Sequence, residues 1–79
     1  MKCLVISEND TVVSGFRTMG LEAVFAPTDE AAVSEVEKAI SSRKVGTLIL
    51  SRHVESVSRE TLDSHRESGR LPFVILLKD

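Results

Sequence analysis

The chain is poor in the residues from which many binding sites are built. Its 79 residues include one cysteine, Cys3, and neither tryptophan nor tyrosine. A single cysteine excludes a disulfide within the chain, which favours a cytoplasmic protein. Without Trp or Tyr the chain has few side chains on which nucleic-acid bases could stack. We therefore expect Cys3 to be an inert core residue and expect no nucleic-acid partner.

An excess of charge of one sign is also missing. Lys and Arg number 10 and Asp and Glu number 12, which gives a net charge of −2 with both signs interspersed. No basic stripe is visible, which argues against a nucleic-acid or anionic membrane surface. No apolar run approaches the ~20 residues of a membrane span, and the start of the chain lacks a signal-peptide pattern. The length predicts one small domain, residues 1–79, without direct membrane insertion.

What is present is an alternation of short apolar runs and amphipathic segments. The apolar runs are short and rich in Val and Ile, which is typical of strands buried on both faces. Helix starts are indicated by Asn9 or Asp10 and by Thr28 or Asp29, and helix ends by Gly20 and Gly69. We predict strands over 2–7, 21–25, 47–51 and 71–77 and helices over 10–19, 29–42 and 54–68.

This order predicts an α/β fold with helices on both faces of a small parallel four-stranded sheet. Right-handed crossovers favour the strand order 2-1-3-4, as in flavodoxin-like and receiver-like folds. A receiver domain needs an acceptor Asp after the third strand, where this chain has Ser51 and Arg52. The turn after the first strand has no glycine and carries Glu8 and Asp10, so we expect no phosphate-bearing cofactor there.

Polar residues should gather where the first and third strands end. A Ser, a His and a Glu in one place suggest a catalytic triad, but no nucleophile elbow or oxyanion loop accompanies them. The only two histidines, His53 and His65, are too few for a metal site. We therefore predict no catalytic residue, no metal and no enzyme activity. The residues at this point are Ser7, Glu8, Asn9, Ser51, Arg52 and His53.

One stretch carries a family resemblance. The motif Gly15-Phe16-Arg17-Thr18-Met19-Gly20-Leu21, the Glu30-Ala31-Ala32 cluster and the strands at 46–50 and 71–75 resemble the F subunit of V-type and archaeal A-type ATPases and ATP synthases. The resemblance covers nearly the whole chain and its β-α-β order. Family members continue past the last strand into a segment that reaches the catalytic head, whereas this sequence ends at Asp79. No role of such a tail is carried over.

The resemblance implies a non-catalytic subunit of the central rotor stalk. Such a protein packs against the coiled-coil D subunit and meets the A/B head only indirectly, and its complex is peripheral on the cytoplasmic side of a membrane. Two alternatives stay open from the residues. One is a degenerate receiver-like signalling domain that binds a protein without a phosphoacceptor, and the other is a small flavodoxin-like enzyme or ligand binder.

The predicted strand order also indicates a partner-binding face. The first helix should cover one face of the sheet and the other helices the opposite face. One face of the last two strands would then stay uncovered, with Phe73, Ile75 and Leu77 pointing outward as candidate contacts. We expect Phe16 and Met19 to lie in the core. Arg17 is expected to pair with a partner's acid or to remain a solvated cation.

Overall fold

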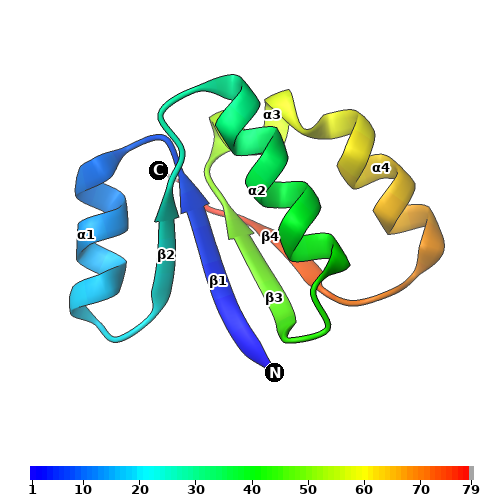
Figure 1. Ribbon diagram of the computed structural model, residues 1–79, viewed down its shortest axis with the longest axis horizontal. Coiled ribbons are helices and arrows are strands. Elements are labelled where there is room, and N and C mark those ends of the chain that lie inside the picture. Colours follow the sequence, from blue (N-terminus) through cyan, green and yellow to red (C-terminus); the bar gives the residue numbers. More distant parts are fainter. Residues whose placement is uncertain (79) are drawn as a thin grey trace.

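Four short strands form one parallel sheet in the order β2-β1-β3-β4. The computed structural model describes residues 1–78, shown in Figure 1. The strands are β1 (Lys2–Ser7), β2 (Glu22–Phe25), β3 (Val45–Leu50) and β4 (Phe73–Leu76). The register places Val5 opposite both Ala23 and Ile49, and Ile49 opposite Ile75. The predicted fold class and strand order are confirmed.

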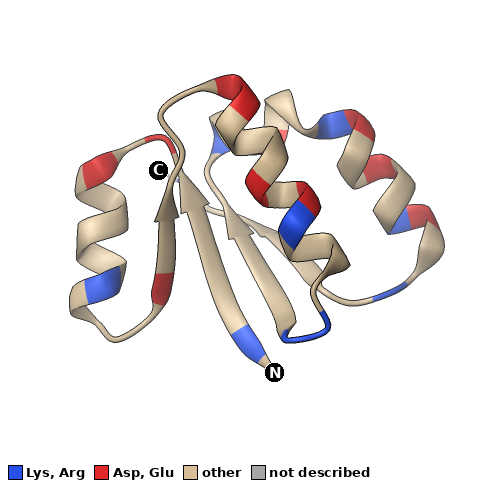
Figure 2. Ribbon diagram, in the orientation of Figure 1, with Lys and Arg blue, Asp and Glu red and all other residues tan. Residues whose placement is uncertain are grey.

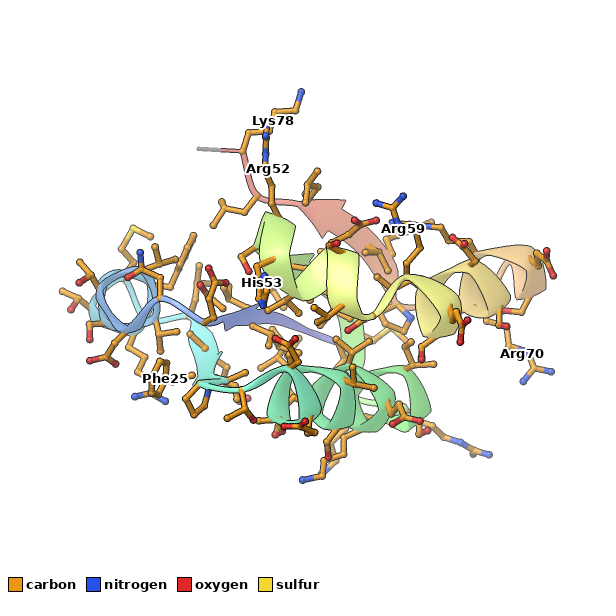
Figure 3. The ribbon with its side chains drawn as sticks, turned by 90° about the horizontal axis from the view of Figure 1, so that it is seen from above. Phe25, Arg52, His53, Arg59, Arg70 and Lys78 are labelled. Atoms are coloured by element: carbon orange, nitrogen blue, oxygen red, sulfur yellow. The ribbon has the colours of Figure 1, made fainter. Side chains whose placement is uncertain are left out.

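The helices are divided unequally between the two faces of the sheet. Helix α1 (Asp10–Thr18) covers one face, and α2 (Asp29–Ser41), α3 (Arg52–Val57) and α4 (Arg59–Ser68) cover the other. In Figure 3, which is seen from above, α1 stands apart from the other three helices. Because neighbouring side chains of a strand point to opposite faces, Val5 packs under α1 while Ile6 packs under α2.

The two buried clusters, one on each face of the sheet, differ in size accordingly. On the side of the three helices, buried side chains from strands and helices form the larger cluster, which contains Ile6, Ala26, Ala32, Val36, Ala39, Leu48, Leu50, Val54 and Leu62. On the α1 side only Val5, Val13 and Ala23 are buried, and Phe16 and Ile49 are partly buried against them. The sheet is thus well covered on one face and only in part on the other.

The predicted helix over 54–68 is wrong as a single element. The structure begins α3 at Arg52, breaks at Ser58 and continues as α4. Val54 of α3 and Leu62 of α4 both enter the larger core cluster, where each is fully buried. The hydroxyl of Ser58 is buried at this break and has no hydrogen-bond partner among the described residues.

Smaller differences concern single positions. The third strand begins at Val45 instead of residue 47, and the fourth spans Phe73–Leu76 instead of 71–77. Cys3 lies in β1 as expected but is only half-buried, so its assignment to the core is wrong. Of the alternative helix caps, Asn9 and Thr28 are the ones used: their side chains accept backbone N–H groups of α1 and α2.

The joint between α1 and β2 depends on Gly20. This residue has φ +88°, in the left-handed region that side chains with a Cβ rarely adopt. Its N–H donates to the carbonyl of Arg17 at 3.0 Å, and the next N–H, of Leu21, donates to the carbonyl of Phe16 at 3.1 Å. These bonds occupy carbonyls at the helix end and turn the chain directly into β2.

Two glycine substitutions should therefore act in opposite directions. We expect Gly20→Ala to lower the free energy of unfolding by about 1 kcal/mol, because alanine is strained at this φ. The matched control is Gly15→Ala inside α1, where a Cβ would meet no atom within 4 Å. It should raise the free energy of unfolding by up to about 1 kcal/mol through helix propensity. Urea titrations of both variants measure this, and an unchanged midpoint for Gly20→Ala would contradict it.

Candidate functional site

The motif at 15–21 builds the contact between α1 and the edge of the sheet. Phe16 packs against the α1-side cluster, half-buried. The Nε of Arg17 donates to the carbonyl oxygen of Ala23 in β2 at 3.0 Å. Met19 is 67% exposed, so the expectation that it lies in the core is wrong. Met19 is the C-cap residue of α1, which ends at Thr18.

An uncovered apolar surface lies on the α1 side of β3 and β4, and we name it the open face. It consists of Ile49, Phe73, Ile75 and Leu77: the register places Ile49, Phe73 and Ile75 on the same side of the sheet, and Leu77 follows β4 beside α1. Phe73 is 70% exposed and Ile75 is 50% exposed. Neither β3 nor β4 carries a charged residue, as Figure 2 shows. Uncovered apolar surface of this kind is typical of a protein interface.

Helix α1 forms one wall of a groove beside the open face. The groove has a volume of about 350 Å³ and lies where α1 approaches the end of β4. Leu77 lies in this groove and is half-buried, whereas Phe73 and Ile75 are open to solvent. The exposed gap at Gly15 deepens the groove, because no side chain fills that position. The groove is lined by Val12, Gly15, Phe16, Met19, Leu77 and Lys78.

The four candidate contact residues are not in one place. Phe73 and Ile75 share one side of β4, at one edge of the sheet, and Leu77 follows the strand in the groove at α1. Arg17 reaches β2, which forms the opposite edge. Its guanidinium group makes no ion pair with an acid among residues 1–78, and the side chain is exposed. The use of Arg17 to hold a backbone carbonyl could not be inferred from the sequence.

The polar residues at the carboxyl ends of β1 and β3 form two separate pairs. The hydroxyl of Ser51 donates to Oε1 of Glu8 at 2.6 Å and accepts the N–H of Val54 at 3.3 Å. The Nε2 of His53 lies 2.8 Å from Oδ1 of Asp29. Ser51 therefore caps α3 and ties it to β1, while His53 ties α3 to the start of α2. The residues gather as expected, but the serine and the histidine are not bonded to each other.

The other histidine has a structural contact as well. His65 is buried in α4, and its Nε2 lies 2.8 Å from the carbonyl oxygen of Pro72. This contact fixes the end of α4 to the segment that leads into β4. Across residues 1–78 no group of three or more His, Cys, Asp or Glu is arranged to hold a metal ion. In the same part of the chain, none of the helices is long and apolar enough to cross a membrane.

A comparison with protein families decides what kind of protein carries this surface. The sequence profile of the family described as ATP synthase (F/14-kDa) subunit matches residues 3–79. The chain belongs to this family. The match confirms the resemblance to the F subunit of V/A-type ATPases that residues 15–21 and the strand order indicate. No curated protein matches the chain closely enough to count as a relative.

Membership in the ATP synthase F-subunit family gives the open face a context. A component of an ATPase complex has protein partners, and an apolar face next to a groove is a surface that such a partner can cover. The polar pairs at the carboxyl ends of β1 and β3 instead connect elements of this chain to one another. We therefore regard the open face, and not the polar pairs, as the candidate functional site.

The Ser51–Glu8 pair predicts a specific acid titration. The hydrogen bond from Ser51, assisted by the nearby His53, holds the pKa of Glu8 below its ordinary value of 4.5, although partial burial opposes this. Because the folded-state pKa is the lower one, the stability contributed by the carboxylate is complete above the unfolded pKa. It is lost as the pH falls through the folded pKa.

Ser51→Ala should therefore raise the pKa of Glu8 toward 4.5 and weaken the acid dependence of stability. It should also cost about 1 kcal/mol at every pH, because the N-cap of α3 is lost. NMR titration of the Glu8 carboxyl carbon and unfolding at several pH values measure the two effects separately. Ser51→Thr keeps a hydroxyl and is the control. An unchanged Glu8 pKa in Ser51→Ala would show that the hydrogen bond does not cause the shift.

Proposed function

We propose that the chain is the non-catalytic F subunit in the central rotor stalk of a V/A-type ATPase or ATP synthase. In this role it binds the coiled-coil D subunit and turns with it, and it meets the A/B head only indirectly. The complex would be peripheral on the cytoplasmic side of the membrane. Family membership supports the assignment to this complex. The observation that carries the partner assignment is the open face, with Phe73 and Ile75 exposed beside the groove at α1.

The shape of the open face suits a helix of the partner. In α/β sheets each face is ordinarily covered by helices, and here the position over β3 and β4 on the α1 side is vacant among the described residues. A coiled coil offers helices with apolar stripes, and α1 would lie beside the docked helix as a neighbour. Burying Phe73 and Ile75 in this way would remove apolar surface from water and so favour association.

The absence of charge on β3 and β4 also favours an apolar partner stripe. The charged residues nearest to the open face are at its margins, where Lys78 follows β4 and points away from the molecule (Figure 3). Polar contacts at the margin of an interface contribute to specificity and to the association rate more than to affinity. We therefore propose that the apolar side chains of the open face provide the affinity for the partner, and that charged residues at its margin orient the partner.

Arg17 is the candidate for such an orienting contact. Its Nε is engaged by Ala23, but the rest of the exposed guanidinium group can donate to a carboxylate of the partner. Since Arg17 lies on the β2 side of the sheet, a partner that contacts both Arg17 and Phe73 has to extend past α1. A long coiled coil has the required length. The same arginine would then hold β2 in place and contact the partner.

The proposal is tested by co-expression of the chain with the coiled-coil D subunit, followed by size-exclusion chromatography with light scattering. We expect a stable one-to-one complex. Phe73→Asp and Ile75→Asp should each weaken it by about 30-fold, the effect of losing an interface anchor worth about 2 kcal/mol. Leu71→Asp is the matched control, because Leu71 is a similarly exposed apolar residue outside the open face.

The result can contradict the proposal in two ways. If the folded chain forms no complex with the D subunit, the assignment as a D-binding rotor subunit fails. If a complex forms but Phe73→Asp and Ile75→Asp bind as tightly as Leu71→Asp does, the open face is not the contact. Circular dichroism of each variant shows that the fold is kept, as expected for changes at exposed positions.

A further inference from the structure

The two edge strands of the sheet, β2 and β4, differ in how their outward backbone groups are hydrogen-bonded. At the β2 edge, the N–H of Ala26 donates to the carbonyl of Ser7 at 2.9 Å. Backbone groups of a strand point alternately to its two sides, so those of Val24 also face β1 and those of Ala23 face outward. The outward carbonyl of Ala23 is the one that Arg17 binds. A side chain of the same chain therefore occupies the middle of this edge.

The β4 edge has no such protection. The N–H of Leu77 donates to the carbonyl of Leu50 at 2.7 Å, so the backbone groups of Ile75 and Phe73 also face β3. The N–H and C=O groups of Val74 and Leu76 then point outward. Strand β4 pairs only with β3, and no side chain of the described residues is bonded to these outward groups. They form a bare edge that can accept another strand.

The side chains of this edge are apolar on both sides. Phe73 and Ile75 are exposed on the α1 side, and Leu76, which points to the other side, is 39% exposed. No charged residue occurs between Arg70 and Lys78. Edge strands are ordinarily protected from pairing by charged residues, prolines or bulges, and none of these occurs within Phe73–Leu76.

We propose that β4 pairs antiparallel with β4 of a second copy of this chain, about a two-fold axis at Ile75. Val74 of each copy then lies opposite Leu76 of the other, and each such pair exchanges both of its hydrogen bonds. Ile75 lies opposite itself, and Phe73 lies opposite Leu77. The two sheets join into one continuous sheet, and the apolar side chains of both copies meet on its α1 side.

The occupant is a second copy because the edge is self-complementary and the assembly closes. Apolar residues at 73, 75 and 77 meet residues 77, 75 and 73 across the axis, so every contact is made twice. At the β2 edge Arg17 occupies the carbonyl of Ala23, and Glu22 adds a charge to this strand. The pairing at β4 is two-fold and uses the β4 edge of both copies, so this contact closes at two copies. The pairing concerns the isolated chain and rests on the backbone edge of β4, whereas the proposed function rests on the α1-side face of the same strand; Phe73 and Ile75 take part in both contacts.

The charges that flank β4 give the pairing a salt dependence. Arg70 precedes the strand and Lys78 follows it. Antiparallel pairing brings Lys78 of one copy toward Arg70 of the other at both ends of the contact. These like charges repel each other, and salt screens such exposed pairs. We expect the dimer to become stronger as the ionic strength rises.

Light scattering and sedimentation velocity of the isolated chain, from micromolar to millimolar concentration, test the proposal. The mass should rise from the 8.7 kDa of one chain to twice that value and stop there. Ile75→Asp and Ile75→Lys should each remain monomeric, because like charges would face each other on the axis. An equimolar mixture of the two variants should restore the dimer, because opposite charges then face each other. Phe25→Lys, at an exposed apolar residue of β2 at the opposite edge of the sheet, should dimerise as the unmodified chain does.

Four results would overturn the proposal. The unmodified chain could stay monomeric up to millimolar concentration, or its association could continue beyond two copies. The single variants Ile75→Asp and Ile75→Lys could dimerise as well as the unmodified chain, which would place the contact elsewhere. The mixture could fail to form a dimer although the unmodified chain does, which would exclude the axis at Ile75. Thermal melting of each variant confirms that the monomers compared are folded.

Discussion

A parallel sheet of apolar strands has to be covered on both faces to keep its side chains from water, and the helices of this chain are divided unequally between the two faces. Three helices cover most of one face, and α1 covers only β1 and β2 on the other. The buried cluster on the α1 side is consequently small, and Phe73 and Ile75 remain exposed. The exposed apolar surface on this side follows from the lack of a helix over β3 and β4 among the described residues. Under the proposed function, a partner within the ATPase complex would cover this surface.

The chain uses its polar groups mainly to hold its own elements in position. Ser51 links α3 to β1 through Glu8, His53 links α3 to α2 through Asp29, and His65 fixes the segment before β4. Arg17 does the same for β2. Each group suggests chemistry when it is considered alone, yet each has a structural partner. In contrast, Phe73 and Ile75 remain exposed, and the outward backbone groups of β4 have no hydrogen-bond partner among the described residues, which is why both proposals concern this strand.

The sequence predicted the elements, the strand order and the uncovered face for reasons that are local or topological. Periodicity and turn residues identify helices and strands, and right-handed crossovers leave few arrangements for four parallel strands. Errors arose where packing decides. Met19 was expected in the core because it shares a helix face with Phe16, but α1 ends at Thr18 and Met19, its C-cap residue, is exposed. The predicted helix over 54–68 is divided at Ser58 into α3 and α4, and each part contributes an apolar residue, Val54 or Leu62, to the core.

The sequence by itself therefore determined the fold class, the family and the existence of an uncovered apolar strand. Only the tertiary structure decided which polar groups are satisfied and which edge of the sheet is bare. Ser51 and Glu8 are 43 positions apart, and His53 and Asp29 are 24 positions apart, so no local pattern pairs them. The difference between the two edges likewise depends on whether a side chain from another element reaches the outward carbonyls. That is a matter of distance in space, which short-range sequence patterns do not encode.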